Sequence, residues 1–222
     1  MPTYDACAGA VDLDTLRTEP CWLAVDLSSN TDLTAIAAAW RIGDGYAVKV
    51  WFFCPADNLS ARADRDGVPY PAWARDGHII ATPGNVVDYR AVEEKVRALC
   101  ASLDVREIAF DPHLAQNMLN NLLEDGLPAV EMRQGWITMA PAIKDLERAI
   151  VGGQFTHSGN PVLRWNFSNI AVETDKAGNR MFHKGKSKDR IDGAVAVAMA
   201  VGRAAAGSTG ASVYEQRGLV VL

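Results

Sequence analysis

One segment sets the architecture of this chain: CWLAVDLSSNTD, residues 21–32. An apolar run of β-strand length ends on Asp26, small polar turn residues follow, and a second apolar run begins at Leu33. A carboxylate at the end of a buried strand is poorly solvated, so it needs a metal ion, a hydrogen-bond donor or a proton as its partner. We therefore interpret Asp26 as the first carboxylate of a divalent-metal site.

Two further strands follow the first after short connections. Residues 33–42 form a second apolar strand, which ends at the turn Gly43-Asp44-Gly45, and residues 46–54 form a third strand. Since these connections are too short for crossovers, the three strands are predicted to form an antiparallel meander.

Helical and strand patterns alternate over the rest of the chain. Prolines punctuate residues 55–85, which we expect to form short surface helices and loops. The further predicted elements are helix 86–103, strand 105–110, helix 114–123, strand 127–132, helix 139–151, a short strand, turn and helix within 154–170, hairpin strands 171–174 and 180–183, and helix 191–206. This order predicts a mixed α/β sheet with helices on both faces. The right-handed crossover rule puts strand 105–110 beside the first strand.

Three acidic residues are predicted to meet at one edge of that sheet. Asp26 and Asp111 each end an apolar strand, and Asp192 begins the last helix, where Gly193 lets the helix lie close to the sheet. Neighbouring carboxylates repel one another unless cations neutralise them, and oxygen-only ligands suit Mg²⁺ or Mn²⁺. Two such cations can activate a water molecule and stabilise the leaving oxygen in phosphodiester hydrolysis. Asp32 is a further candidate ligand.

Each of these acids also has a purely structural interpretation. Asp26 and Asp32 are typical of turns, Asp111 before a proline is typical of a helix N-cap, and Asp192 favours a helix N-terminus. The basic run before Asp192 is either a solvated face or a surface that holds a DNA phosphate backbone. We predict DNA contact for Arg180, His183, Lys184, Lys186, Lys188 and Arg190.

The composition argues against several classes of protein. A net charge of −5 argues against non-specific coating of nucleic acid, although a local basic patch is compatible with a nuclease. No apolar run is long enough to span a bilayer, so we expect no membrane partner. The sequence also lacks the GxxxxGK[ST] phosphate loop, so it does not encode an ATPase of that type.

Four motifs in a fixed order resemble one known family. They are VDLSSNTD (25–32), FDP (110–112), HSGNPVLRW (157–165) and SKDRIDGAVA (187–196). Together they make the chain similar, over about residues 20–220, to the C-terminal nuclease domain of the large terminase subunit of tailed bacteriophages. That family has an RNase H-like fold.

The resemblance implies a two-metal endodeoxyribonuclease that cuts concatemeric viral DNA at the start and end of genome packaging. It implies metal ligands at Asp26, Asp111 and Asp192 and a double-stranded DNA substrate. The implied partners are the packaging ATPase domain, which we expect to lie outside this chain, the portal and the small terminase subunit. The implied location is the host cytoplasm, at the procapsid portal, and not the mature virion. Some relatives have Glu at the middle position, where this chain has the shorter Asp111.

The resemblance also suggests a domain organisation, and other functions stay open. We expect a linker or lead-in at residues 1–19, an RNase H-like nuclease domain at 20–206 and a flexible C-terminal tail at 207–222. The alternatives are an actin- or sugar-kinase-like nucleotide-binding domain, a Holliday-junction resolvase-like nuclease, and a non-catalytic domain that docks on the portal or motor. Against the first, Ser28-Ser29-Asn30 lacks the glycine usual in phosphate-binding turns.

Overall fold

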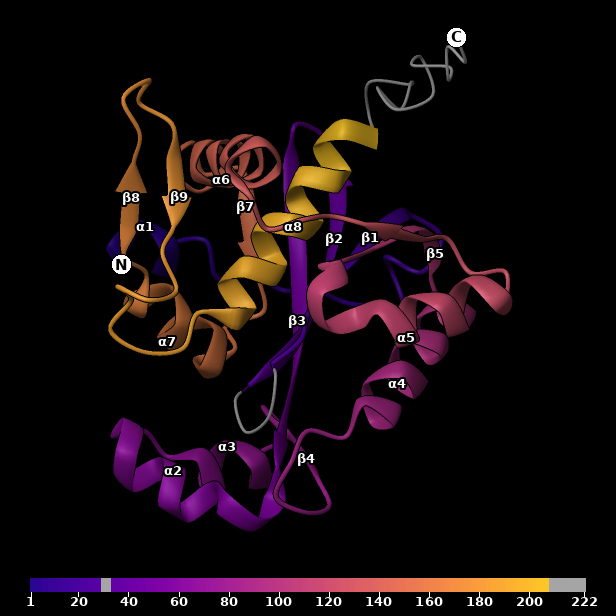
Figure 1. The fold of residues 1–222 in the computed structure, drawn as a ribbon. Helices are drawn as coiled ribbons and strands as arrows, with labels where there is room; N and C mark the ends of the chain where they lie inside the picture. Colours follow the sequence, from indigo (N-terminus) through magenta and orange to yellow (C-terminus); the bar gives the residue numbers. More distant parts are fainter. Residues whose placement is uncertain (29–32, 208–222) are drawn as a thin grey trace, which may run out of the picture.

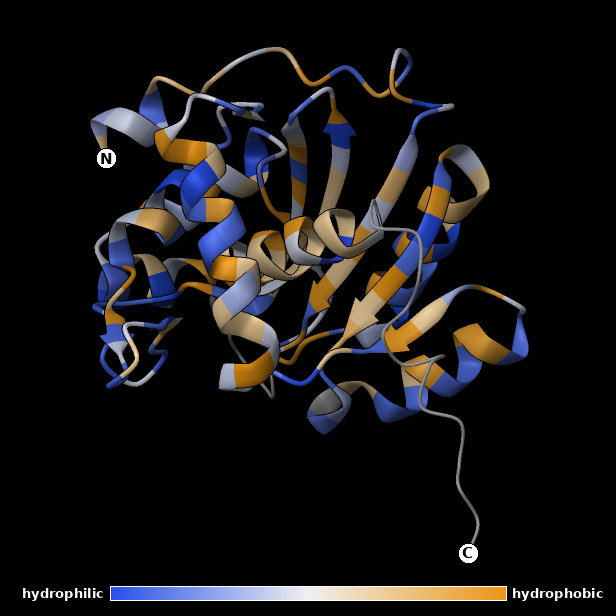
Figure 2. Ribbon diagram, turned by 90° about the horizontal axis from the view of Figure 1, so that it is seen from above, coloured by the Kyte–Doolittle hydropathy of each residue, from blue (hydrophilic) through white to orange (hydrophobic). Residues whose placement is uncertain are grey.

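A mixed β-sheet forms the centre of the protein, with helices on both faces (Figures 1 and 2). The computed structural model describes residues 1–28 and 33–207 of the 222-residue chain. Strands β1 (Pro20–Asp26), β2 (Thr34–Ile42) and β3 (Gly45–Pro55) form the antiparallel meander that the sequence predicts. Strand β5 (Asp104–Phe110) lies parallel to β1, as the crossover rule predicts.

Three short strands complete the sheet. Its order is β4-β3-β2-β1-β5-β6, and β6 (Ala129–Glu131) extends the parallel side. Strands β4 (Ile80–Thr82) and β7 (Phe155–His157) both pair in parallel with β3. The sequence does not predict β4, because three residues after a proline-rich segment carry little pattern of their own and depend on pairing with β3.

The helices divide between the two faces of the sheet. The hydrophobic core on one face includes α4 (Tyr89–Ser102) and α5 (Pro112–Glu124). The core on the other face includes α6 (Trp136–Val151), α7 (Pro161–Asn169) and α8 (Asp192–Gly207). The remaining elements of the described residues are α1 (Pro2–Asp5), the 3₁₀ turn η1 (Ala56–Asn58), α2 (Leu59–Asp66), α3 (Tyr70–Arg75) and the hairpin strands β8 (Val172–Thr174) and β9 (Arg180–Phe182).

Two peripheral segments pack more closely than a surface location implies. Tyr4 of α1 is buried, and its ring stacks on His157 with centroids 4.1 Å apart. In the proline-rich segment, Tyr70 and Trp73 are buried and their rings contact Trp165 of α7. Part of residues 55–85 therefore belongs to the core, because these aromatic side chains bury large apolar areas. None of the helices in the described ranges is long and apolar enough to cross a membrane.

The alternation of side chains along the strands decides which face each acid takes. Trp22 and Ala24 of β1 belong to the core beneath α8, whereas the alternate residues of the strand belong to the core on the opposite face: Cys21, Leu23 and Val25. Asp26 continues this series on the α8 face. In β5, Ala109 lies on the same face, and Asp111 follows two residues later. Since β1 and β5 are parallel and level at their ends, both acids lie at one edge of the sheet.

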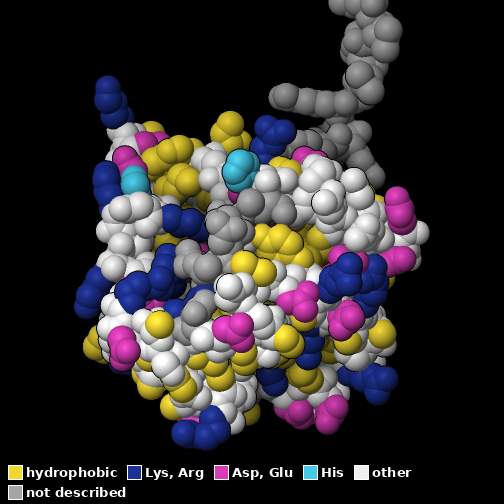
Figure 3. Space-filling model, turned by 60° about the horizontal axis from the view of Figure 1, so that its bottom comes forward, with side chains coloured by type: hydrophobic (Ala, Val, Ile, Leu, Met, Phe, Trp, Pro, Cys, Tyr) yellow, Lys and Arg dark blue, Asp and Glu magenta, His cyan; other side chains and the backbone are white. Residues whose placement is uncertain are grey.

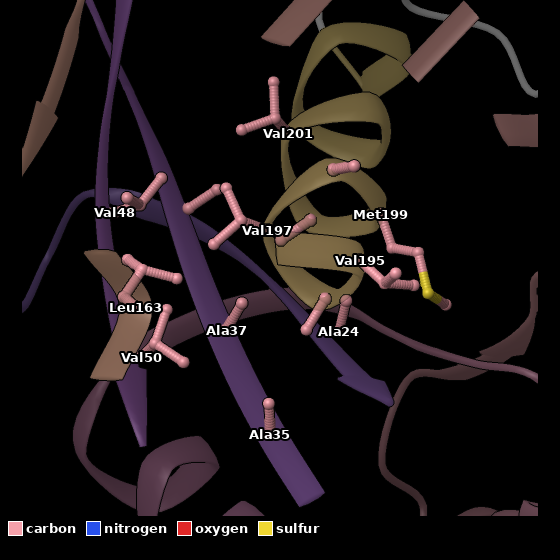
Figure 4. Close-up of a cluster of buried hydrophobic side chains, with 14 of the residues drawn as sticks. Ala24, Ala35, Ala37, Val48, Val50, Leu163, Val195, Val197, Met199 and Val201 are labelled. Carbon is pink, nitrogen blue, oxygen red and sulfur yellow. The ribbon is translucent and has the colours of Figure 1, made fainter. Parts of the chain in front are cut away.

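Small residues bring α8 close to the sheet. Figure 4 shows Ala24 and Ala37 of the sheet beside Val197 of α8. A Cβ atom added at Gly193 would stand 2.4 Å from the ring of Phe52 in β3. The glycine therefore lets the first turn of α8 rest directly on the sheet, next to its acid-bearing edge.

Candidate active site

Asp26 is a buried carboxylate with donors on two sides. It is the last residue of β1. Gln134 donates a hydrogen bond from Nε2 to Asp26 Oδ1 at 2.7 Å. Lys184 Nζ lies 2.9 Å from each of the two carboxylate oxygens. The structural alternative of a turn residue does not account for this burial and this pairing.

Asp192 is a second buried carboxylate, contributed by the helix layer that packs on the sheet. It begins α8, and the next backbone N–H, that of Gly193, donates to Asn166 Oδ1 of α7 at 2.7 Å, which anchors this turn. Oδ2 of Asp192 is buried without a hydrogen-bond partner among the described residues. Burial and the charge of Asp26 raise the pKa of Asp192 to about 7, whereas the charge of Lys184 acts in the opposite direction.

Lys184 connects the two buried acids. Besides its contacts with Asp26, its ammonium lies 4.0 Å from Asp192 Oδ1. Burial alone would lower the pKa of Lys184, but the charges of Asp26, Asp192 and Asp111 hold it above its ordinary value. The ammonium therefore serves as the counter-ion of the acid cluster.

Asp111 is an N-cap and also part of this cluster. Its Oδ1 accepts a hydrogen bond from the backbone N–H of His113, 3.1 Å away, at the start of α5. Its Oδ2 accepts one from the backbone N–H of Gln134 at 3.3 Å. Gln134 therefore joins the two acids: its side chain binds Asp26 and its backbone N–H binds Asp111. The geometry is therefore compatible with Asp111 both as the N-cap of α5 and as a member of the acid cluster.

Sequence reasoning missed Gln134. It lies between β6 and α6, after the third parallel strand. Its place in the chain was the one clue in the sequence. Gln134 closely follows a strand that runs parallel to the acid-bearing strands, and a residue in that place reaches the same edge of the sheet. The amide carries no charge and matches no metal-ligand pattern, so the signal was weak.

The donor set fits a hard divalent cation. Its ligand atoms are carboxylate oxygens, which Mg²⁺ and Mn²⁺ prefer, and Asp192 offers a buried oxygen without a partner. Within residues 1–28 and 33–207, however, no three acidic, His or Cys side chains stand close enough together to hold one ion. The ammonium of Lys184 lies between two of the acids instead. Asp32, the further candidate ligand, lies outside the described residues.

The six basic residues predicted to contact DNA occupy different environments. Lys184 reaches the acids, whereas Arg180 pairs with Glu147, and both His183 and Lys186 lie within 4.0 Å of Glu173. Lys188 donates its backbone N–H to Asn169, and Arg190 lies 3.9 Å from Asp189. Figure 3 shows a similar mixture of basic and acidic side chains over one face of the molecule. Contact with DNA stays a prediction for these residues.

Comparison with known proteins finds similarity to large terminase subunits. The family described as "Terminase large subunit, endonuclease domain" matches residues 4–208. The large terminase subunit of Enterobacteria phage HK97 is 37% identical over 193 residues, covering 85% of this chain and 38% of that protein. Protein YmfN of Escherichia coli K12 is 32% identical over 216 residues, covering 92% of this chain and 48% of that protein.

Solved structures agree with this assignment. The crystal structure of the HK97 large terminase superimposes with a TM-score of 0.83 at 33% identity, covering 91% of this chain and 42% of that chain. The large terminase nuclease of thermophilic phage G20c, solved with bound magnesium, gives a TM-score of 0.54 at 11% identity and covers 82% and 80% of the two chains. This second likeness supports the fold, which is the RNase H-like mixed sheet that the sequence predicts.

The matches cover most of this chain but only part of each relative. This chain spans less than half the length of the HK97 terminase and of YmfN. The family match covers almost all of the described residues, including the three acids and Lys184. The chain belongs to the family of terminase large subunit endonuclease domains.

Proposed function

We propose that this chain is a metal-dependent DNA endonuclease that cuts concatemeric viral DNA during genome packaging. One observation carries the proposal: Asp26 of the sheet and Asp192 of α8, which packs on the sheet, are both buried and share the ammonium of Lys184. Asp111 is tied to the same cluster through Gln134. Buried carboxylates this close repel one another, so the fold favours cations at this point. Membership of the terminase family supports DNA as the substrate.

The residues of this chain would prepare the site in specific ways. Two divalent cations, Mg²⁺ or Mn²⁺, would supply an activated water molecule and stabilisation of the leaving oxygen. Asp26, Asp111 and Asp192 would hold them through oxygen ligands. Gln134 orients the carboxylate of Asp26, and the anchored first turn of α8 orients Asp192. The G20c nuclease, solved with bound magnesium, supports this class of ion by analogy.

The basic segment 180–190 would position the substrate. Lys186 and Lys188 lie in the same loop as Lys184, and they would bind the phosphates of double-stranded DNA, with Lys186 exchanging its contact with Glu173 for a phosphate. We further propose that the chain works with a packaging ATPase domain, the portal and the small terminase subunit at the procapsid portal in the host cytoplasm. The family membership supports these partners.

Cleavage of supercoiled plasmid, measured while Mn²⁺ is titrated, tests the proposed activity. We expect nicking that requires Mn²⁺ or Mg²⁺ and stops when the metal is chelated. Asp26→Asn removes a buried negative charge that would hold the cation, and it should reduce nicking by at least about 100-fold, because the cation supplies the activated water molecule and the charge stabilisation. Asp44→Asn, in the exposed turn between β2 and β3, is the matched control and should nick like the wild type.

Two results would contradict the proposal. Nicking that persists in Asp26→Asn would assign the activity to a contaminant or another site. ATP binding without nicking at any metal concentration would favour a nucleotide-binding domain instead.

A further inference from the structure

Lys184 is far more exposed than the two buried acids that it contacts. Its side chain is 46% exposed, whereas the side chains of Asp26 and Asp192 are 3% and 13% exposed. The acids belong to β1 and α8, two elements of the core, but Lys184 follows β9 of a short two-stranded hairpin. The cation is therefore the part of the cluster that can leave without disturbing the sheet.

The position of the ammonium matches that of a shared cation. It contacts both oxygens of Asp26 at 2.9 Å and lies 4.0 Å from Asp192, on the side of the cluster that Gln134 also borders. The ammonium thus faces two carboxylates at once. Oδ2 of Asp192 still lacks a hydrogen-bond donor among the described residues.

We propose that Lys184 is a displaceable internal counter-ion: its ammonium occupies the space between Asp26 and Asp192 in the metal-free protein, and a divalent cation must displace it to bind. This inference rests on the proposed metal-dependent function. It adds that the ammonium of Lys184 controls the binding of the cation at the same site. An ammonium and a divalent cation between the same two carboxylates compete, because each repels the other at short range.

The surroundings leave room for this displacement. A cavity of about 390 Å³ adjoins the cluster and is lined by Lys184, Gln134, Trp136 and Phe182 among others. His183 and Gly185, the neighbours of Lys184 in the chain, line the same cavity, so the side chain of Lys184 has space into which it can move.

Mn²⁺ binding without DNA tests the inference. Isothermal titration compares the wild type with Lys184→Met, which keeps a long apolar stem but removes the charge. We expect Lys184→Met to bind Mn²⁺ about tenfold more tightly or more, since it removes a repelling charge at the cation position. Thermal unfolding of the same variant should show a lower Tm in metal-free buffer and a larger rise on Mn²⁺ addition. Lys176→Met, at the exposed tip of the same hairpin, should match the wild type in both measurements.

The outcomes separate this inference from the proposed function. If the wild type binds Mn²⁺ and Lys184→Met binds it equally or more weakly, the counter-ion role is wrong and the metal site stands. If neither protein binds Mn²⁺, both proposals are wrong. Should Lys184→Met not fold, Lys184→Gln takes its place with the same expected gain in affinity, and Lys184→Arg, which keeps the charge, should show none.

Discussion

Gln134 shows how one uncharged residue joins two carboxylates. Its Nε2 donates to Asp26 at 2.7 Å, and its backbone N–H donates to Asp111 at 3.3 Å. A charge-assisted hydrogen bond to a buried carboxylate fixes the direction of its oxygens. We interpret Gln134 as a positioning residue that holds Asp26 while other groups do the chemistry.

Gln134→Met should therefore reduce nicking about tenfold or more and raise the Mn²⁺ concentration needed for half-maximal rate. The backbone contact with Asp111 stays, so only the orientation of Asp26 is lost. The free energy of unfolding should fall by roughly 1.5–3 kcal/mol, as for a lost hydrogen bond to a charged group. Plasmid nicking across a metal titration measures the first effect and urea unfolding the second.

A control on α5 makes this comparison specific. Gln116→Met removes an exposed amide that bonds to Asn120, and it should change neither rate nor metal dependence. An unchanged metal dependence in Gln134→Met would remove Gln134 from the site.

Asp111 combines helix capping with the proposed ligand role, and two substitutions separate these. Asp111→Asn keeps an oxygen for the His113 N–H but loses the acceptor of the Gln134 N–H, so the free energy of unfolding should fall by about 1 kcal/mol. Asp111→Ala removes both acceptors and should cost about 2 kcal/mol. Both variants should lose nicking. If Asp111→Asn nicks at the wild-type rate in plasmid assays, Asp111 only caps α5.

At the scale of elements, the close approach of α8 to the sheet places Asp192. Gly193→Ala would put a Cβ atom 2.4 Å from the buried ring of Phe52 and 3.0 Å from Asn166 Oδ1. Such overpacking typically costs about 1–3 kcal/mol. We expect the first turn of α8 to shift, the melting temperature to fall and the nicking rate to fall as well.

A second glycine of α8 provides the comparison. A Cβ at Gly202 would stand 2.5 Å from the Cβ of Ala142 in α6, far along the helix from Asp192. Gly202→Ala should lower the melting temperature but leave nicking near the wild-type rate at a temperature where both variants are folded. Equal loss of activity in both variants would mean that general destabilisation is responsible.

The loop between β9 and α8 is the element predicted to meet DNA. Replacing Lys186 and Lys188 together by Ala should weaken DNA binding and reduce the slope of log affinity against log salt by about 1 to 2, one for each lost phosphate contact. Lys144→Ala, on the exposed side of α6, is the control. Fluorescence anisotropy at several salt concentrations measures the slopes. A slope equal to that of the wild type would exclude this loop from the DNA path.

At the scale of the whole molecule, the strand order followed from the sequence because its determinants are local. Short turns required the meander, and the crossover rule required β5 beside β1. The period of two along β1 and β5 then places Asp26 and Asp111 on the α8 face. These rules need no knowledge of distant contacts.

The remaining features depend on contacts that no local pattern encodes. The pairing of β4 and β7 with β3 joins short segments far apart in the chain. The arrival of Lys184 at Asp26 depends on where a hairpin docks, so the sequence, which predicts DNA contact for Lys184, does not reveal this pairing. Gln134 was missed for the same reason, since its role exists only once β1, β5 and β6 lie side by side.

Metal binding should stabilise the whole fold, since the cluster exists only in the native state. At a Mn²⁺ concentration 100 times the dissociation constant, the gain is about 2.7 kcal/mol per site. For a chain of this size, that corresponds to a rise in Tm of roughly 5–10 °C. Differential scanning calorimetry should show this rise in the wild type and lose it in Asp26→Asn. A rise of equal size in Asp26→Asn would place the ion elsewhere.

Anomalous diffraction from crystals soaked in Mn²⁺ tests the central claim most directly. We predict an anomalous peak about 2.2 Å from carboxylate oxygens of both Asp26 and Asp192, at the distance of a hard cation from its ligands, with the Lys184 ammonium moved away from them. A map at saturating Mn²⁺ without such a peak, and with Lys184 still bonded to Asp26, would contradict the assignment of these acids to a metal site.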